Sequence, residues 1–176
     1  MKFAILSISV FLFSFCFKKS IYDIRINKLD GVETGMSAFI DKKILITTVS
    51  AVKPRLAFLQ FLDSLKKADK ELIVMVVPAA DFEDKGNEVK FKNLNDSLKS
   101  EIIFTKEINV KKIAGNNQHE LFKWLTHAEE NGHFDIDVDV EEQMFILNRK
   151  GTLYSVLPKE APDSVKIQAL NQPVED

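Results

Sequence analysis

Cysteine is almost absent from this chain, because its 176 residues contain a single one, Cys16, which lies in an apolar N-terminal stretch. From residue 20 onward there is no thiol, so this part can form neither an internal disulfide nor a Cys-x-x-Cys redox pair. Glycine is also scarce, with six residues, and none of the spacings fits a phosphate loop or a nucleotide fingerprint. We therefore expect no nucleotide cofactor, and no other cofactor is indicated.

Neither sign of charge dominates, since 24 basic residues stand against 26 acidic ones. No basic stripe is interleaved with aromatic residues, so no nucleic-acid partner is expected. Long runs of one charge, internal repeats and low-complexity segments are also missing. The length and the 45% hydrophobic content instead predict one domain with a substantial core.

The longest apolar run stands at the start, where Met1-Lys2 precede "FAILSISVFLFSFCF" and Lys18-Lys19 close it. This run is short for a membrane span, but it has the length of the apolar region of an export signal. We predict that residues 1–19 are an export signal or a membrane anchor. The protein is then exported, to the periplasm or the cell envelope.

The fate of this N-terminal segment stays open. No small-x-small cleavage site is visible, and Cys16 follows the run, although Phe15 before it fits a bacterial lipobox poorly. The alternatives are a lipid on Cys16, an uncleaved anchor through residues 3–17, an atypical cleavage, or a buried N-terminal helix of the domain.

Two continuous apolar runs, residues 43–49 and 71–77, predict central strands that are covered on both faces. Between them, phenylalanine and leucine recur at helical spacing to about Lys67, and Pro54 suits the first turn of that helix. Strand, helix and strand of these lengths form a βαβ unit, so the two strands should be parallel neighbours. Pro78 should end the second one.

Shorter patterns complete the predicted order. Strands are expected at residues 21–27, 32–34, 101–105, 134–140, 144–147 and 152–157, and helices at 89–98, 119–126 and 163–170. The last two strands should form a hairpin through a turn that ends at Gly151. The order predicts an α/β domain over residues 20–171, with a thioredoxin-like fold, a mixed central sheet flanked by helices and an N-terminal β-hairpin. Residues 172–176 are read as a polar tail.

Several stretches resemble the glutathione peroxidase family, and their order agrees from end to end. The segment "AGNNQHELFKWL" at residues 114–125 is the most specific, since it is similar to the family's Asn-Ala-His-Pro-Leu-Tyr-Lys-Trp-Leu helix. Residues 144–158, "MFILNRKGTLYSVLP", resemble the final hairpin. The resemblance covers about residues 20–170 and implies a peroxidase that acts in oxidative stress.

The family's reactive residues are not matched here. Its stretch of the type Val-Ala-Ser-Lys-Cys-Gly falls on residues 49–54, which places Lys53 at the position of the cysteine or selenocysteine. The family's glutamine falls on Asp81, and its Trp-Asn pair falls near Val140 and Glu141. Peroxide reduction needs a thiolate or selenolate that is oxidised and then regenerated, and a lysine amine cannot do this. The resemblance therefore indicates a protein without peroxidase activity.

Two uses of Lys53 stay open. It could hold an anion or act as a nucleophile at a helix N-terminus. Alternatively it is a solvated loop lysine, or it forms an ion pair with Asp81 or Glu141. The three histidines beside Asp135, Asp137 and Asp139 do not predict a metal site. His119 and His127 lie two helical turns apart, and alternating aspartates suit a solvated strand face.

We expect an exported binding or structural protein whose partner, a protein or a small molecule, is unknown. The alternative is an enzyme, either an oxidoreductase of the glutathione peroxidase family or one that uses Lys53. A membrane tether through residues 3–17 or Cys16 is a further expectation.

Overall fold

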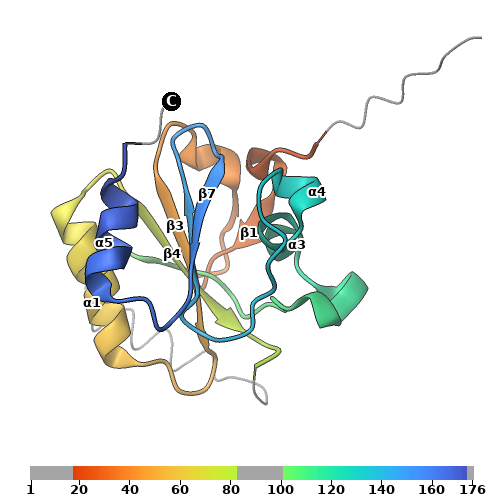
Figure 1. The fold of residues 1–176 in the computed structure, drawn as a ribbon. Coiled ribbons are helices and arrows are strands. Elements are labelled where there is room, and N and C mark those ends of the chain that lie inside the picture. The colour runs from red at the N-terminus through yellow and green to blue at the C-terminus, as the bar shows by residue number, and fades with distance from the viewer. Residues whose placement is uncertain (1–17, 83–100, 174–176) are drawn as a thin grey trace, which may run out of the picture.

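The computed structural model describes residues 18–82 and 101–173 and shows a mixed five-stranded sheet with helices on both faces (Figure 1). The strands are β1 (Arg25–Asn27), β2 (Glu33–Gly35), β3 (Ile44–Ser50), β4 (Ile73–Ala79), β5 (Ile103–Phe104), β6 (Met144–Leu147) and β7 (Leu153–Leu157). The α-helices are α1 (Leu56–Ala68), α3 (Glu120–Thr126), α4 (Ala128–Asn131) and α5 (Asp163–Asn171). The 3-10 helices are η1 (Ile21–Asp23), η2 (Met36–Phe39) and η3 (Lys112–Asn117).

The sheet has the strand order β5-β4-β3-β6-β7. β3 and β4 are parallel neighbours over their whole length, as predicted from their two apolar runs, and β6 lies antiparallel on the other side of β3. Every residue of β3 is buried, because both of its faces are covered. β1 and β2 form the separate N-terminal hairpin that was expected.

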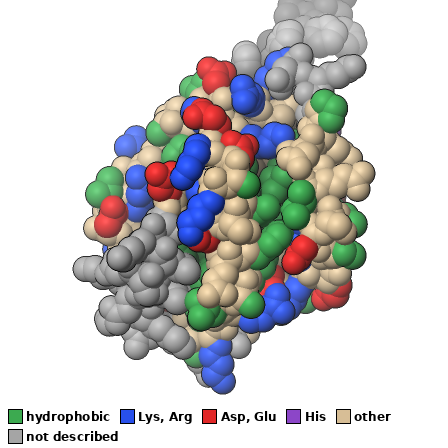
Figure 2. Space-filling view, turned by 90° about the vertical axis from the view of Figure 1, so that its left-hand side faces the viewer, with side chains coloured by type: hydrophobic (Ala, Val, Ile, Leu, Met, Phe, Trp, Pro, Cys, Tyr) green, Lys and Arg blue, Asp and Glu red, His purple; other side chains and the backbone are tan. Residues whose placement is uncertain are grey.

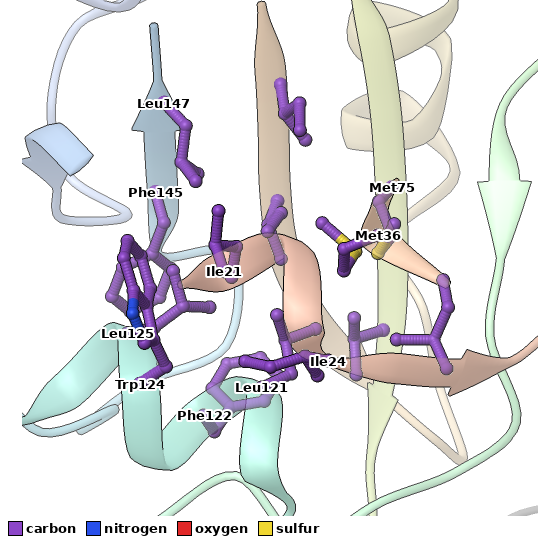
Figure 3. Close-up of a cluster of buried hydrophobic side chains, with 14 of the residues drawn as sticks. Ile21, Ile24, Met36, Met75, Leu121, Phe122, Trp124, Leu125, Phe145 and Leu147 are labelled. Atoms are coloured by element: carbon purple, nitrogen blue, oxygen red, sulfur yellow. The ribbon is translucent and has the colours of Figure 1, made fainter. Parts of the chain in front are cut away.

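The sheet divides the hydrophobic core in two. The cluster that we call the α1 core packs against α1 and α5, with Phe58, Leu59 and Leu62 of α1 buried against the sheet. The opposite cluster, the α3 core, packs against α3, η1 and η2. In Figure 3 the side chains of α3 point toward those of η1 and β6. There, the Phe122 and Phe145 rings meet edge to face, with centroids 6.1 Å apart.

The turn between β6 and β7 confirms the predicted hairpin. Gly151 has a φ of +78°, a conformation that glycine adopts without strain. A Cβ at this position would lie within 3 Å of Tyr22 and Ile21. The turn therefore packs directly on η1, and Tyr22 donates a 3.0 Å hydrogen bond to the Arg149 carbonyl.

The predicted strand at residues 134–140 is wrong, since this segment is a loop. The alternation of apolar and acidic residues does not reflect two sheet faces: Val138 is buried, but Ile136 and Val140 are 39% and 37% exposed. Asn131 fixes the start of the loop, because its amide donates to three carbonyls, including that of Phe134. The side-chain hydrogen bonds take the place of a strand ladder.

Pro78 does not end β4, which continues to Ala79. Pro78 has no N–H to donate, but its carbonyl accepts the Ile108 N–H at 3.1 Å. Pro78 therefore stays in register in the strand, opposite Val49 of β3. Pro54 also differs from its predicted place, since it precedes Arg55, the N-cap of α1.

Two further boundaries differ from the prediction. Residues 21–27 contain η1 before the short β1, because Ser20 and Asp23 form a capping box that starts a helical turn. β5 is shorter than residues 101–105, and the helix expected at 89–98 lies outside the described residues. The helices predicted at 119–126 and 163–170 are confirmed as α3 and α5. None of the helices within residues 18–82 and 101–173 is long and apolar enough to cross a membrane.

Candidate functional site

The candidate site lies where β3 and β4 end and β6 begins, at the lower end of the sheet in Figure 1. The chain leaves β3 at Ser50 and enters α1 after Arg55. Asp81 follows β4, and Glu141 precedes β6. The topology therefore brings the predicted site residues to one end of the sheet, on both sides of β3.

Lys53 lies in a tight loop whose backbone is held by Ser50. The Ser50 hydroxyl accepts hydrogen bonds from the Val52 N–H at 3.2 Å and the Lys53 N–H at 2.8 Å. The Lys53 side chain is exposed. The suggested ion pair with Asp81 or Glu141 is not formed, because both carboxylates have other partners.

Glu141 bridges the end of β3 and the segment after β7. One carboxylate oxygen accepts the Ser50 N–H at 3.1 Å, and the other lies 3.0 Å from the Lys159 ammonium. Its side chain is one-third exposed. Glu141 thus neutralises Lys159 and fixes the end of β3, which are structural tasks.

Glu142 is the residue at this site that the sequence analysis missed. It is 1% exposed and pairs with Arg55, with 2.6 Å between Oε2 and Nη2. Its φ of +66° is unusual for a side-chain-bearing residue, and its N–H donates to the Thr48 carbonyl at 2.7 Å. Two adjacent glutamates before a strand give no sequence signal that one of them is buried.

Asp81 binds the backbone of the segment that follows β5. Its carboxylate accepts the backbone N–H groups of Val110 at 2.9 Å and Lys111 at 2.7 Å. The Lys111 ammonium lies 4.2 Å from the centre of the Phe82 ring. Since its oxygens hold the backbone, Asp81 is not positioned as a general base.

The histidines and the aspartates of the loop do not assemble a metal site, and no cluster of three or more metal-binding side chains occurs among the described residues. His119 caps α3, with its Nδ1 accepting the Leu121 N–H at 3.2 Å, as expected for a structural histidine. Burial lowers the pKa of His119. Asp135 forms an ion pair with Lys112 and stays exposed, and Asp137 accepts the Lys112 N–H at 2.8 Å, so these aspartates belong to a loop and not to a strand face.

Taken together, these contacts engage the carboxylates at this end of the sheet. Each of the three carboxylates near Lys53 is bound by a backbone amide or a cation, and Val140, at the place expected for an aromatic residue, lies in a loop. The described residues contain no cysteine. The arrangement can hold a loop rigidly and present a cation, but it offers no sulfur nucleophile.

Comparison with known proteins finds similarity in structure. No family model matches the chain, and no curated protein matches it. A solved structure of a protein named Trgpx, in its apo form, has a TM-score of 0.64 at 20% identity, covering 88% of this chain and 98% of that one. GPX1 of T. cruzi has a TM-score of 0.66 at 16% identity, covering 86% and 94%.

A more distant neighbour is a secreted disulfide oxidoreductase of Mycobacterium tuberculosis, homologous to DsbE of E. coli. Its TM-score is 0.56 at 9% identity, with 85% of this chain and 94% of that one covered. These likenesses confirm the predicted thioredoxin-like fold with a mixed sheet and an N-terminal hairpin. The neighbours include glutathione peroxidase-type proteins, so the resemblance found in the sequence extends to the fold.

Proposed function

We propose that this protein is an exported, glutathione-peroxidase-like protein that binds a protein or small-molecule partner without reducing peroxides. The observation that carries the proposal is Lys53, which stands between the end of β3 and the start of α1 in a folded region without cysteine. In the family that the sequence resembles, this is the position of the reactive sulfur or selenium. Loss of that atom removes the group that peroxide oxidises.

The contacts around Lys53 support this proposal. A working nucleophile at a helix N-terminus needs a lowered pKa and a neighbouring base or acceptor. Here the Ser50 hydroxyl accepts the local backbone amides, and the neighbouring carboxylates Glu141 and Asp81 are bound elsewhere. The chain keeps the sheet and helices of the fold while Lys53 replaces the reactive residue, and such a fold can still bind a partner.

The test is a peroxidase assay on the purified full-length chain, with glutathione or thioredoxin as the reductant. The Cys16→Ser variant serves as the matched control, because it contains no thiol at all. We expect both proteins to consume hydrogen peroxide no faster than buffer. Steady, reductant-dependent peroxide loss that persists in Cys16→Ser and disappears in Lys53→Ala would contradict the proposal.

Export is the second part of the proposal, and it rests on the charged start, the apolar run and Lys18-Lys19. The secreted neighbour of similar fold supports it. Cell fractionation should recover the protein outside the cytoplasm. Labelling with a fatty-acid probe, with Cys16→Ser as the control, distinguishes a lipid anchor from an apolar one, and recovery of the full-length chain from the cytoplasm would count against export.

A further inference from the structure

The sequence contains a single Asn-Gly pair, Asn131-Gly132, which stands at the end of α4. An asparagine before glycine is prone to deamidation, because glycine has no side chain to hinder attack by its backbone nitrogen. In this reaction the Gly132 nitrogen bonds to Cγ of Asn131, and the side-chain amide leaves as ammonia with the Gly132 proton. Water then opens the cyclic succinimide to aspartate or isoaspartate.

The fold holds the Asn131 side chain away from this reaction. The residue is only 8% exposed, and its amide nitrogen lies 2.9–3.2 Å from three backbone carbonyls, two in α3 and one in the following loop. Its Oδ1 accepts the N–H groups of His133 and Phe134, both at 2.8 Å. Ring closure requires the carboxamide to turn toward Gly132, so these hydrogen bonds must break first.

The attacking nitrogen is held as well. The Gly132 N–H donates to the Ala128 carbonyl at 2.8 Å, and Gly132 has a φ of +85° as the C-cap of α4. This left-handed glycine is a common way to end a helix. Attack on Asn131 requires the nitrogen to lose its proton and to leave this carbonyl. Both partners of the reaction are therefore blocked while α4 is intact.

The position of α4 allows it to open without the rest of the domain. It has four residues and lies beside α3 at the surface (Figure 1). The face that carries α1 and α5, shown in Figure 2, is on the other side of the sheet. Short surface elements open locally at a lower free energy than central strands. We therefore expect α4 and its loop to open while the α1 core stays packed.

We propose that Asn131 is a modification site that deamidates only when α4 and the following loop open, and that the product cannot rebuild the original contacts. An aspartate still accepts the N–H groups of His133 and Phe134, but its ionised carboxylate cannot donate to the three carbonyls that the amide binds. Isoaspartate also lengthens the backbone. Deamidation thus makes a local opening irreversible, and the lifetime of the folded protein depends on how often α4 opens.

The consequence for the fold is tested with Asn131→Asp, which reproduces the aspartate product. Its midpoint in urea, followed by circular dichroism, should lie below that of the wild-type protein, and failure to fold would support the proposal equally. Asn116→Asp makes the same change at an exposed asparagine of η3 and should leave the midpoint unchanged. A wild-type midpoint for Asn131→Asp would contradict the proposed loss of contacts.

Mass spectrometry of peptides from the full-length chain tests whether the fold protects the site. The matched control is Asp30→Asn, which places a second Asn-Gly pair in an exposed turn before Gly31. In mildly alkaline native buffer, residue 30 of this variant should deamidate at least about tenfold faster than Asn131 of the same chain. In guanidinium chloride the two sites should react at similar rates. Equal rates in native buffer, or an Asn131 that stays unreactive in the denaturant, would overturn the proposal.

Discussion

Thr47 and Thr48 are neighbours in β3, and both are fully buried, but their hydroxyls have different surroundings. Thr47 donates a 2.8 Å hydrogen bond to the Gln143 carbonyl, whereas the Thr48 Oγ1 has no hydrogen-bond partner among the residues that the structure describes. An unpaired buried hydroxyl opposes folding, since it loses its bonds to water.

The two threonines therefore give a matched pair of substitutions. Thr48→Val should raise the free energy of unfolding by up to about 1 kcal/mol, and Thr47→Val should lower it by about 1 kcal/mol. Urea titration followed by circular dichroism measures both. A loss of stability in Thr48→Val as large as that in Thr47→Val would show that the Thr48 hydroxyl is hydrogen-bonded in solution.

The Arg55–Glu142 pair combines a buried carboxylate with a guanidinium whose side chain is 59% exposed. Because water screens the cation, we expect Arg55→Ala to lower the free energy of unfolding by about 1–2 kcal/mol, less than for a fully buried pair. Arg25→Ala, which removes an ion pair with Glu33 in which both side chains are exposed, is the control and should cost less. A double-mutant cycle with Glu142→Gln measures the coupling, and a coupling near zero would contradict this account.

His119 gives the fold a defined dependence on pH. Burial lowers its pKa in the folded protein, so the unfolded chain binds a proton more readily. The stabilising contribution of the neutral imidazole is complete above about pH 6.5 and decreases as the pH falls below that value. Protonation also removes the Nδ1 acceptor that caps α3.

The effect of pH can be isolated with His119→Asn, which keeps a capping acceptor but does not titrate. Between about pH 7.5 and pH 5, the wild-type protein should lose unfolding free energy relative to this variant. Parallel stability curves for the two proteins would exclude His119 as the titrating group.

At the scale of elements, Asn131 determines how α4 passes into the following loop. Its amide donates to the carbonyls of Trp124, Leu125 and Phe134, and its Oδ1 accepts the N–H groups of His133 and Phe134. All of these partners are backbone groups, so one side chain replaces the hydrogen bonds that a strand would make.

Asn131→Ala should lower the free energy of unfolding by about 2–3 kcal/mol, because it leaves several backbone groups unpaired. The exposed Asn116 provides the control, and Asn116→Ala should change stability by less than about 0.5 kcal/mol. Thermal unfolding of both variants makes the comparison. Equal melting temperatures would show that the loop is held by other contacts.

The elements that could be predicted from the sequence are those whose pattern is local. The apolar runs of β3 and β4, and Gly151 in the last hairpin, specify structure within a few residues. The loop at residues 134–140 could not be predicted, because its alternation imitates a strand while Asn131 determines its path. Pro78 likewise stays in β4 through a contact with the distant Ile108.

The candidate site was predictable in its location but not in its contacts. The position of Lys53 follows from the order of strand, loop and helix. The partners of its neighbours do not, because Glu141 binds Lys159 and Asp81 binds the amides of Val110 and Lys111, all distant in sequence. Such contacts depend on tertiary packing, which leaves no trace in local patterns.

At the scale of the whole molecule, two cores share one sheet, and β3 belongs to both. Ile44 and Ile46 contribute to the α3 core, and Leu45 and Val49 contribute to the α1 core. Neither core can be lost without exposing the other face of the same strands. We therefore expect a single cooperative unfolding transition.

Trp124, the only tryptophan, lies in the α3 core and reports on it by fluorescence. Leu62→Ala removes a fully buried side chain from the opposite core and should cost about 2–5 kcal/mol. If unfolding is cooperative, the Trp124 fluorescence and far-UV circular dichroism midpoints shift together to lower urea. A Trp124 midpoint that does not move would show that the cores unfold separately.

The attachment of the first described residues to α3 and to the β6–β7 turn has a mechanical consequence. The Trp124 indole donates to the Lys19 carbonyl at 2.8 Å, Lys19 pairs with Glu120 at 2.9 Å, and Tyr22 bonds to Arg149. A force applied to the chain ahead of Lys18 is thus borne first by α3 and then by the turn at Gly151. Under tension, we therefore expect the contacts of Lys19 and Tyr22 to break before the hydrogen bonds between the central strands.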